Sequence, residues 1–296
     1  MPVRQARADD HDAVAAFTED TWSDRDVGDY IADAFPEWVA SDGPDQRTIV
    51  ATVDGTPVGV CQARLLTDDE AWLGGLRVAP DHRGEGHGEA MVADLFAWCR
   101  ERGGTVARNL VFGWNGPGMA QSRAVGFEPV TTCRWLELTP DADAQAGSDV
   151  VDDPATAWRF WTHSDARTHL SGLARADDEP WALSELDRRR LETLAAEERA
   201  VALVDDGCRG MAVRVGTRER DGETVAEYAV AAWADTAAAA EVFAALRADA
   251  AACGAAAARV LVPDTPRAVS DAATTRCRLG DTTEYVFAAD LTGGDF

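Results

Sequence analysis

A glycine-rich loop in the first half of the chain carries the clearest chemical signature of the sequence. It has the pattern R-G-x-G-x-G and consists of Arg83, Gly84, Glu85, Gly86, His87 and Gly88. Glycines at alternate positions let the backbone turn and direct successive N–H groups inward. The arginine adds a formal charge, and the start of a following helix adds the positive end of its dipole. Such a loop is suited to bind a pyrophosphate group.

Two better-known phosphate-binding loops do not fit this pattern. A P-loop would end in Gly-Lys-Ser/Thr, and the sequence contains no lysine. A Rossmann loop would place its third glycine one position later and would follow the first strand of the chain. A turn that serves tight packing alone is the remaining alternative. The preceding arginine, a preceding strand and a following amphipathic helix favour the anion site.

The elements around the loop must hold it between a strand and a helix. The apolar pattern predicts a strand over 72–79 and a helix over 89–102, which the pair Gly103-Gly104 ends. Upstream we expect helices over 11–22 and 29–39 and a hairpin around Asp54-Gly55. Downstream we expect a strand over 106–113, a short helix over 119–125 and a strand over 130–138.

The second half of the chain repeats this order of elements. The segment 140–155 is acidic, polar and non-periodic, which predicts a linker. An offset of 154 residues aligns Asp81 with Asp235, Cys99 with Cys253 and Gly126 with Gly280. We therefore interpret the chain as a tandem duplication, with one domain over 1–139 and another over 156–296.

The segment around the loop resembles the GNAT superfamily of N-acetyltransferases. Arg83-x-x-Gly86-x-Gly88 is similar to motif A of that family, and Asn115 followed by Gly126-Phe127 is similar to its N-x(10)-G-F segment. The resemblance covers about 3–139. It implies an α/β (α+β) fold with two GNAT-like domains, each a mixed, mostly antiparallel sheet flanked by helices, the second being degenerate. It also implies acetyl-CoA as co-substrate, with its pyrophosphate on the loop and Asn115 in the pocket floor.

Acetyl transfer to an amine needs a base, because an amine with a pKa near 10.4 is almost fully protonated at neutral pH. By resemblance that base is Glu70, although Asp68, Asp69 and general surface acidity leave the choice open. The resemblance places thioester-oxygen donors at the backbone around Leu76, Arg77 and Val78. The slot of the usual tyrosine acid holds Ser122, which is a poor direct proton donor.

The acceptor side is less informative. Acidic and aromatic residues gather in the two predicted N-terminal helices and could hold a cationic amine: Glu19, Asp20, Trp22, Asp24, Asp26, Asp29, Tyr30, Asp33 and Trp38. Ordinary acidic surface with core aromatics is the stronger interpretation. The acceptor is expected to be a small-molecule or peptide amine.

No metal site is expected from the sequence. His82 and His87 lie in the loop without a cysteine or third ligand at a recognised spacing, and His163 and His169 are no better placed. The six cysteines show no C-x-x-C pair and are interpreted as reduced thiols.

The second half lacks the loop. Under the 154-residue offset, TAAAAE at 236–241 replaces HRGEGH, and Arg276 replaces Ser122. Asp235 and Thr236 are expected to cap the helix with their own oxygens, where an anion would otherwise bind. We therefore expect no acetyl-CoA in the second half, which would instead support the first domain or wall its acceptor site.

The charge excludes several partners. The chain of 296 residues carries 52 acidic and 28 basic side chains, a formal net charge of −24, and every basic one among Lys and Arg is Arg. Nucleic acid and anionic membrane surfaces are therefore unexpected partners. Self-repulsion of this size is screened in molar salt, which predicts a protein of the halophilic cytoplasm. The start of the chain has no apolar signal segment, in keeping with that location.

These observations leave two hypotheses for function. The first is an acetyl-CoA-dependent N-acetyltransferase, in which the amine attacks directly in a ternary complex. The second is a non-catalytic acyl-CoA sensor or partner-binding module, which the missing tyrosine and the altered second half would permit.

Overall fold

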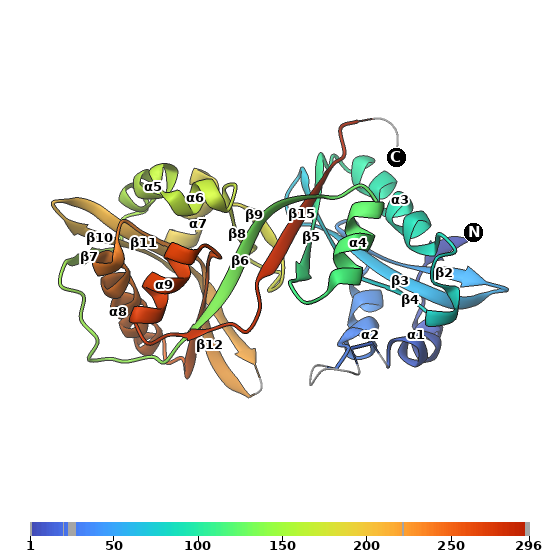
Figure 1. The fold of residues 1–296 in the computed structure, drawn as a ribbon, viewed down its shortest axis with the longest axis horizontal. Helices are drawn as coiled ribbons and strands as arrows, with labels where there is room; N and C mark the ends of the chain where they lie inside the picture. The colour runs from blue at the N-terminus through green and yellow to red at the C-terminus, as the bar shows by residue number, and fades with distance from the viewer. Residues whose placement is uncertain (1, 20, 23–27, 221, 294–296) are drawn as a thin grey trace. The chain divides into compact units, whose positions relative to one another are not determined.

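The computed structural model describes residues 2–19, 21–22, 28–220 and 222–293, and the chain divides into two compact units (Figure 1). Unit 1 comprises Met1–Val111, Asn115–Pro129 and Phe287–Phe296, and unit 2 comprises Phe112–Trp114 and Val130–Val286. Each unit thus combines segments that are distant in sequence. The predicted domain bounds are 1–139 and 156–296. They place residues 130–138 in the first domain and residues 287–296 in the second, and they stay a prediction.

The sheet of unit 1 combines antiparallel strand pairs with a parallel one. Its strands lie in the order β1 (Val3–Gln5), β2 (Gln46–Val53), β3 (Thr56–Leu65), β4 (Glu70–Val78), β5 (Val106–Phe112) and β15 (Glu284–Asp290). Neighbours from β1 to β4 are antiparallel, and β4 pairs with β5 in parallel. The predicted hairpin between β2 and β3 turns at Asp54 and Gly55, both with positive φ.

Helices cover both faces of this sheet. They are α1 (His11–Thr18), α2 (Ile31–Ser41), α3 (His87–Arg100) and α4 (Gly116–Ala124). Val60 of β3 packs in one core cluster with Val14 of α1 and Ile31 of α2. The preceding residue, Gly59, faces Met91 of α3. Because successive strand residues point to opposite faces, α1 and α2 lie on one face and α3 lies on the other (Figure 1).

Unit 2 repeats this plan. Its strand order is β6 (Glu128–Leu138), β13 (Ala257–Pro263), β12 (Glu223–Trp233), β11 (Gly207–Arg220), β10 (Arg199–Asp205) and β7 (Asp149–Val151), with β14 (Arg278–Leu279) also beside β6. Strands β8 (Leu173–Arg175) and β9 (Leu183–Glu185) form a separate hairpin pair. Here β12 and β13 are the parallel pair, as β4 and β5 are in unit 1.

The helices of unit 2 are α5 (Pro154–His163), α6 (Asp165–His169), α7 (Arg188–Glu197), α8 (Thr236–Ala252) and α9 (Pro266–Thr274). The apolar core forms where α8 lies on the sheet, with Val242, Phe243 and Leu246 against Leu136 and Val260. The segment predicted to be a linker contains β7, which pairs with β10. Within the described ranges, no helix combines the length and the apolar character needed to cross a membrane.

Candidate functional site

The glycine-rich loop joins β4 to α3, as the sequence predicts. A short 3-10 turn, η2 (Pro80–His82), follows the strand, and the chain then turns through Gly84 and Gly86 at φ values of 76° and 83°. L-residues with a side chain rarely adopt that conformation. Gly86 is the N-cap of α3 and has no side chain to accept from the first N–H groups of the helix. These N–H groups and the positive end of the helix dipole therefore suit an external anion.

Two further features shape the loop. The Arg83 side chain is exposed and its Nε donates to the carbonyl oxygen of Val78 at 3.2 Å, which places its charge beside the end of β4. A Cβ on Gly88 would lie 2.8 Å from Nε2 of Gln121 in α4. The glycine at 88 therefore allows α4 to pack closely against the start of α3.

Strands β4 and β5 separate after their first residues. Although both strands lie wholly within the described chain, their pairing covers only Glu70–Trp72 on β4, opposite 106–108 on β5. A bulge follows in β4, where Gly75 and Leu76 together lie opposite Cys61 of β3. Gly75 has φ 67°, and a Cβ there would collide with Trp38 of α2. The glycine pair thus permits the bulge and the close approach of α2.

The bulge sets the direction of the backbone donors at 76–78. The N–H of Ala79 donates to Val58 of β3 at 2.8 Å. Since donors alternate along a strand, the N–H of Arg77 also points toward β3, and that of Val78 points toward the space beside β5. Of the three predicted backbone donors, Val78 is thus oriented toward the opening and Arg77 is not.

Glu70 lies at the far end of β4 from the loop. Eight residues separate it from Val78, which is about 26 Å at a rise of ~3.3 Å per residue. Its side chain is buried, 7% exposed, and forms an ion pair with Arg108 of β5. The structure therefore brings Glu70 to an arginine at the paired end of the two strands rather than to the loop.

Ser122 and Asn115 both have defined structural partners. Ser122 is buried in α4, and its Oγ accepts from Nδ2 of Asn109 at 3.0 Å. Asn115 is the N-cap of α4, and its Oδ1 accepts from the N–H of Gly118 at 3.0 Å. Asn109, on β5, was not singled out in the sequence. A polar residue in the middle of the predicted strand 106–113 was the available signal.

The predicted acceptor region contains a cation of the chain itself. Nε of Arg77 lies 2.7 Å from Oδ2 of Asp29, and the guanidinium carbon lies 4.5 Å from the ring centre of Trp22 and 5.8 Å from that of Tyr30. Glu19 and Asp33 are exposed. The predicted residues Asp20, Asp24 and Asp26 lie outside the described residues. Asp29 is therefore neutralised by Arg77, which favours a structural role for this carboxylate.

Three titratable side chains of the loop contact one another. Oε2 of Glu85 lies 3.2 Å from Nδ1 of His82 and 3.2 Å from Nε2 of His87. Hydrogen bonds from His82 and then His87 lower the pKa of Glu85. The spacing of these residues in the sequence does not indicate this cluster, because it matches no recognised ligand pattern.

Comparison with known proteins agrees with this geometry. Residues 11–117 match the acetyltransferase (GNAT) family. The first half of the chain is thus similar to the GNAT acetyltransferase family. The match contains β2 to β5 and the whole glycine-rich loop. No curated protein sequence matches the chain.

Solved structures extend the likeness to both halves. A GCN5-related N-acetyltransferase of Sphaerobacter thermophilus is similar over 99% of this chain and 96% of its own, with 15% identity and a TM-score of 0.58. An acetyltransferase candidate of Thermoplasma acidophilum is similar over 98% of this chain and all of its own, with 17% identity and a TM-score of 0.57. The predicted fold, a tandem of two mixed α/β GNAT-like domains, is confirmed.

The second half of this GNAT tandem carries a different helix start. Oδ1 of Asp235 accepts from the N–H of Ala238 at 2.9 Å, and Oδ2 pairs with Arg209 at 2.5 Å. These contacts, the backbone N–H first, lower the pKa of Asp235. The predicted cap at Asp235 is confirmed. The expectation for Thr236 was wrong, because its hydroxyl donates to Asp271 in α9 at 2.6 Å rather than accepting from α8.

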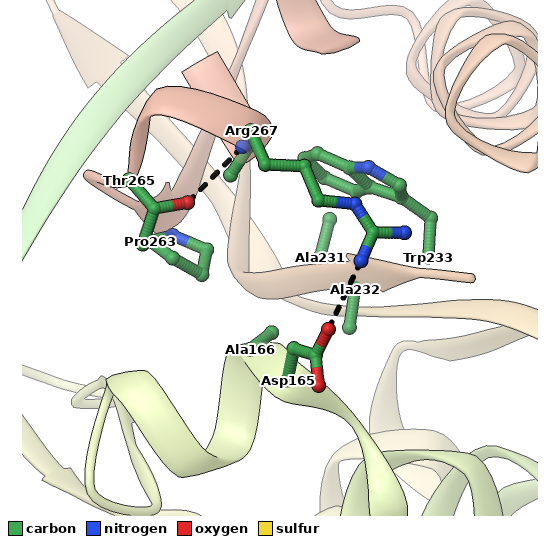
Figure 2. Close-up of a pocket in the computed structure, with 9 residues that line it drawn as sticks. Asp165, Ala166, Ala231, Ala232, Trp233, Pro263, Thr265 and Arg267 are labelled. Carbon is green, nitrogen blue, oxygen red and sulfur yellow. Dashed lines mark hydrogen bonds and ion pairs between the residues drawn. The ribbon is translucent and has the colours of Figure 1, made fainter. Parts of the chain in front are cut away.

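A small pocket remains where β12 and β13 separate in unit 2 (Figure 2). Its cavity of about 60 Å³ has room for roughly two water molecules, whereas ligand sites usually exceed about 300 Å³. Ala231, Ala232 and Pro263 form apolar walls, and Arg267 pairs across the opening with Asp165 at 3.0 Å. Arg276, aligned with Ser122, lies in the turn after α9 with φ 59°. Side chains of unit 2 thus line the small space where β12 and β13 separate.

Proposed function

We propose that the protein is an N-acetyltransferase that moves an acetyl group from acetyl-CoA to an amine by direct attack in a ternary complex. The observation that carries this proposal is the start of α3, where Gly84 and Gly86 adopt left-handed conformations and Gly86 leaves the helix without a side-chain cap. The match of residues 11–117 to the GNAT family supports acetyl-CoA as the acyl donor.

The residues around the loop fit the chemical groups of acetyl-CoA. The first N–H groups of α3 and the guanidinium of Arg83 would hold the pyrophosphate. The N–H of Val78, with the bulge residue Leu76 beside it, would donate to the thioester oxygen and stabilise negative charge there. Asn115 would act indirectly, since it caps α4, the helix that packs against the start of α3. No step of this reaction requires a metal.

Glu70 is proposed as the base that takes the amine proton, and because it lies about 26 Å along β4 from Val78, the proton would reach it through water molecules rather than by direct contact. Val60 of β3 faces α1 and α2, and Gln62, two residues later, lies on the same face of the sheet. Gly74 of β4 lies opposite Gln62, so Trp72 and Glu70, which are two and four residues before Gly74, also lie on this face. To act as a base, Glu70 must exchange its ion pair with Arg108 for the proton of the substrate. Ser122 would act only through Asn109, which it contacts.

The test of the proposed function is a panel of small and peptide amines incubated with acetyl-CoA in molar KCl, with release of the CoA thiol as readout. We expect at least one amine to be acetylated. If acetyl-CoA binds and no amine releases thiol, the alternative function, a non-catalytic acyl-CoA sensor, replaces the proposal. The ion pair of Glu70 and the serine in the tyrosine slot are the observations that favour that alternative.

Paired variants separate a catalytic Glu70 from a structural one. For a base, Glu70→Gln is expected to lower kcat by roughly 10² or more while the Kd of acetyl-CoA is retained. Arg108→Gln removes the same ion pair but leaves the carboxylate, so it should retain far more turnover. Equal losses in both variants would assign Glu70 a structural role.

The environment is proposed to be a halophilic cytoplasm. The net charge of −24 supports this, because self-repulsion is strongest in dilute salt. Urea unfolding in molar and in dilute KCl tests this proposed environment. Equal urea concentrations at the midpoint of unfolding in both salts would contradict it.

A further inference from the structure

His82, Glu85 and His87 place three metal-binding atoms together on the loop. Nδ1 of His82 and Nε2 of His87 each lie 3.2 Å from Oε2 of Glu85, and all three atoms lie within 4.8 Å of one another. The two imidazole rings are 5.9 Å apart between centres and inclined at 82°. Two nitrogen atoms and one oxygen atom therefore lie close enough together for one ion to contact all three.

The two nitrogen–oxygen distances match the spacing of neighbouring ligands around a small divalent ion. Zn–N and Zn–O bonds are about 2.0–2.2 Å, so neighbouring ligands of a tetrahedral ion lie about 3.3 Å apart. Two imidazoles and a carboxylate favour a transition metal over Mg²⁺ or Ca²⁺, which prefer oxygen ligands. We propose that His82, Glu85 and His87 bind one divalent transition-metal ion such as Zn²⁺, with water in the remaining coordination position.

One of the three proposed ligands is buried, and the other two are accessible to solvent. His87 is 2% exposed, and its Nδ1 is buried without a hydrogen-bond partner among the described residues. The ring is thus fixed at the start of α3 with Nε2 directed at Glu85. The side chains of His82 and Glu85 are 31% and 53% exposed, so an ion reaches the site from solvent.

Charge around the site both favours and opposes a cation. Glu85 supplies one negative charge at the site, and the net charge of −24 attracts cations to the whole protein. The start of α3 and Arg83 oppose binding, and ligation through Nε2 leaves the buried Nδ1–H of His87 unpaired. A micromolar affinity is therefore expected, weaker than that of a closed four-ligand site.

Hydrogen bonds from both histidines to Glu85, without a metal, are the competing explanation of the same geometry. A cobalt titration separates the two. Co²⁺ is added to the full-length protein in molar KCl without acetyl-CoA, and the visible d–d absorption and the stoichiometry are recorded. We expect one ion per chain and no thiolate charge-transfer band. Absence of the d–d band would overturn the proposal.

Variants assign the ion to its ligands. His82→Gln changes a partly exposed side chain and Glu85→Gln an exposed one, so both variants are expected to fold, and each should weaken Co²⁺ binding by roughly tenfold or more. His163→Gln is the matched control, because His163 is exposed and lies outside the cluster. Equal affinity in His82→Gln and His163→Gln would assign the ion elsewhere and overturn the proposal. Neither measurement involves turnover, so its outcome is independent of the acetyltransferase proposal.

Discussion

The starts of α3 and α8 occupy equivalent places in the two halves and solve the same physical problem in opposite ways. Each helix follows a strand that pairs in parallel with the next strand. In α3 the N-cap is Gly86, with φ 83° and no side chain. In α8 the N-cap is Asp235, whose extended backbone directs its carboxylate onto the helix N–H groups. One helix leaves its donors for an external anion, and the other supplies the anion itself.

The arginines near the two helices differ in the same sense. Arg209 pairs with the capping carboxylate of Asp235, so its charge is neutralised within unit 2. Arg83 hydrogen-bonds a backbone carbonyl, which leaves its positive charge available. The GNAT-like fold therefore does not depend on the glycine-rich loop. The sheet, the parallel strand pair and the helix persist in unit 2 after the glycines and the free arginine are replaced.

The largest expected effect is on acetyl-CoA binding in Gly86→Val. A β-branched residue at φ 83° is strained, so the loop must change shape and lose its aligned donors. We expect the Kd of acetyl-CoA, measured by calorimetry, to rise about 100-fold. Gly254→Val is the control, since Gly254 follows α8 with φ 73° and has open space at its Cβ. A comparable loss of affinity in both variants would show that strain alone, and not the loop, controls binding.

A smaller effect is expected from the two arginines. Arg83→Gln removes an exposed charge near the proposed pyrophosphate position, which should weaken acetyl-CoA binding by about fivefold, and less in higher salt. Arg209→Gln removes the corresponding charge in unit 2 and should leave the Kd unchanged. Calorimetry at two KCl concentrations checks both. If Arg209→Gln weakened binding as much as Arg83→Gln, the functional difference between the two helix starts would be refuted.

Removing the cap of α8 should affect stability and not binding. Asp235→Ala deletes the acceptor for the N–H of Ala238 and the partner of Arg209, so the melting temperature should fall by a few degrees. Acetyl-CoA binding should remain one molecule per chain with unchanged affinity. A second acetyl-CoA site in this variant would mean that Asp235 alone prevents acetyl-CoA from binding at the start of α8.

Local sequence signals predicted most elements and the loop, because glycine pairs, alternation and helical periodicity act over a few residues. They placed the start of α3 at residue 89, since Gly86 and Gly88 have low helix propensity, whereas the helix begins at His87. They could not pair Glu70 with Arg108 or Thr236 with Asp271, because those contacts depend on packing between elements far apart in sequence. For the same reason, local patterns did not show that residues 287–290 belong to unit 1.

The smallest expected effect is a pH dependence confined to α8. Asp235 has a lowered pKa in the folded protein, so its capping contribution is present above the unfolded value of 3.8 and is lost as pH falls through the folded pKa. Asp235→Asn keeps a capping oxygen that does not titrate. Hydrogen exchange at the Ala238 amide should therefore accelerate on acidification in the wild type more than in Asp235→Asn, and the difference between the two proteins cancels the titration of other acids. No such difference is expected at the start of α3, where Gly86 has no side chain to titrate. Equal acceleration at Ala238 in both proteins would mean that the carboxylate charge of Asp235 does not hold the helix start, and that the contrast between the two helices lies in the glycines alone.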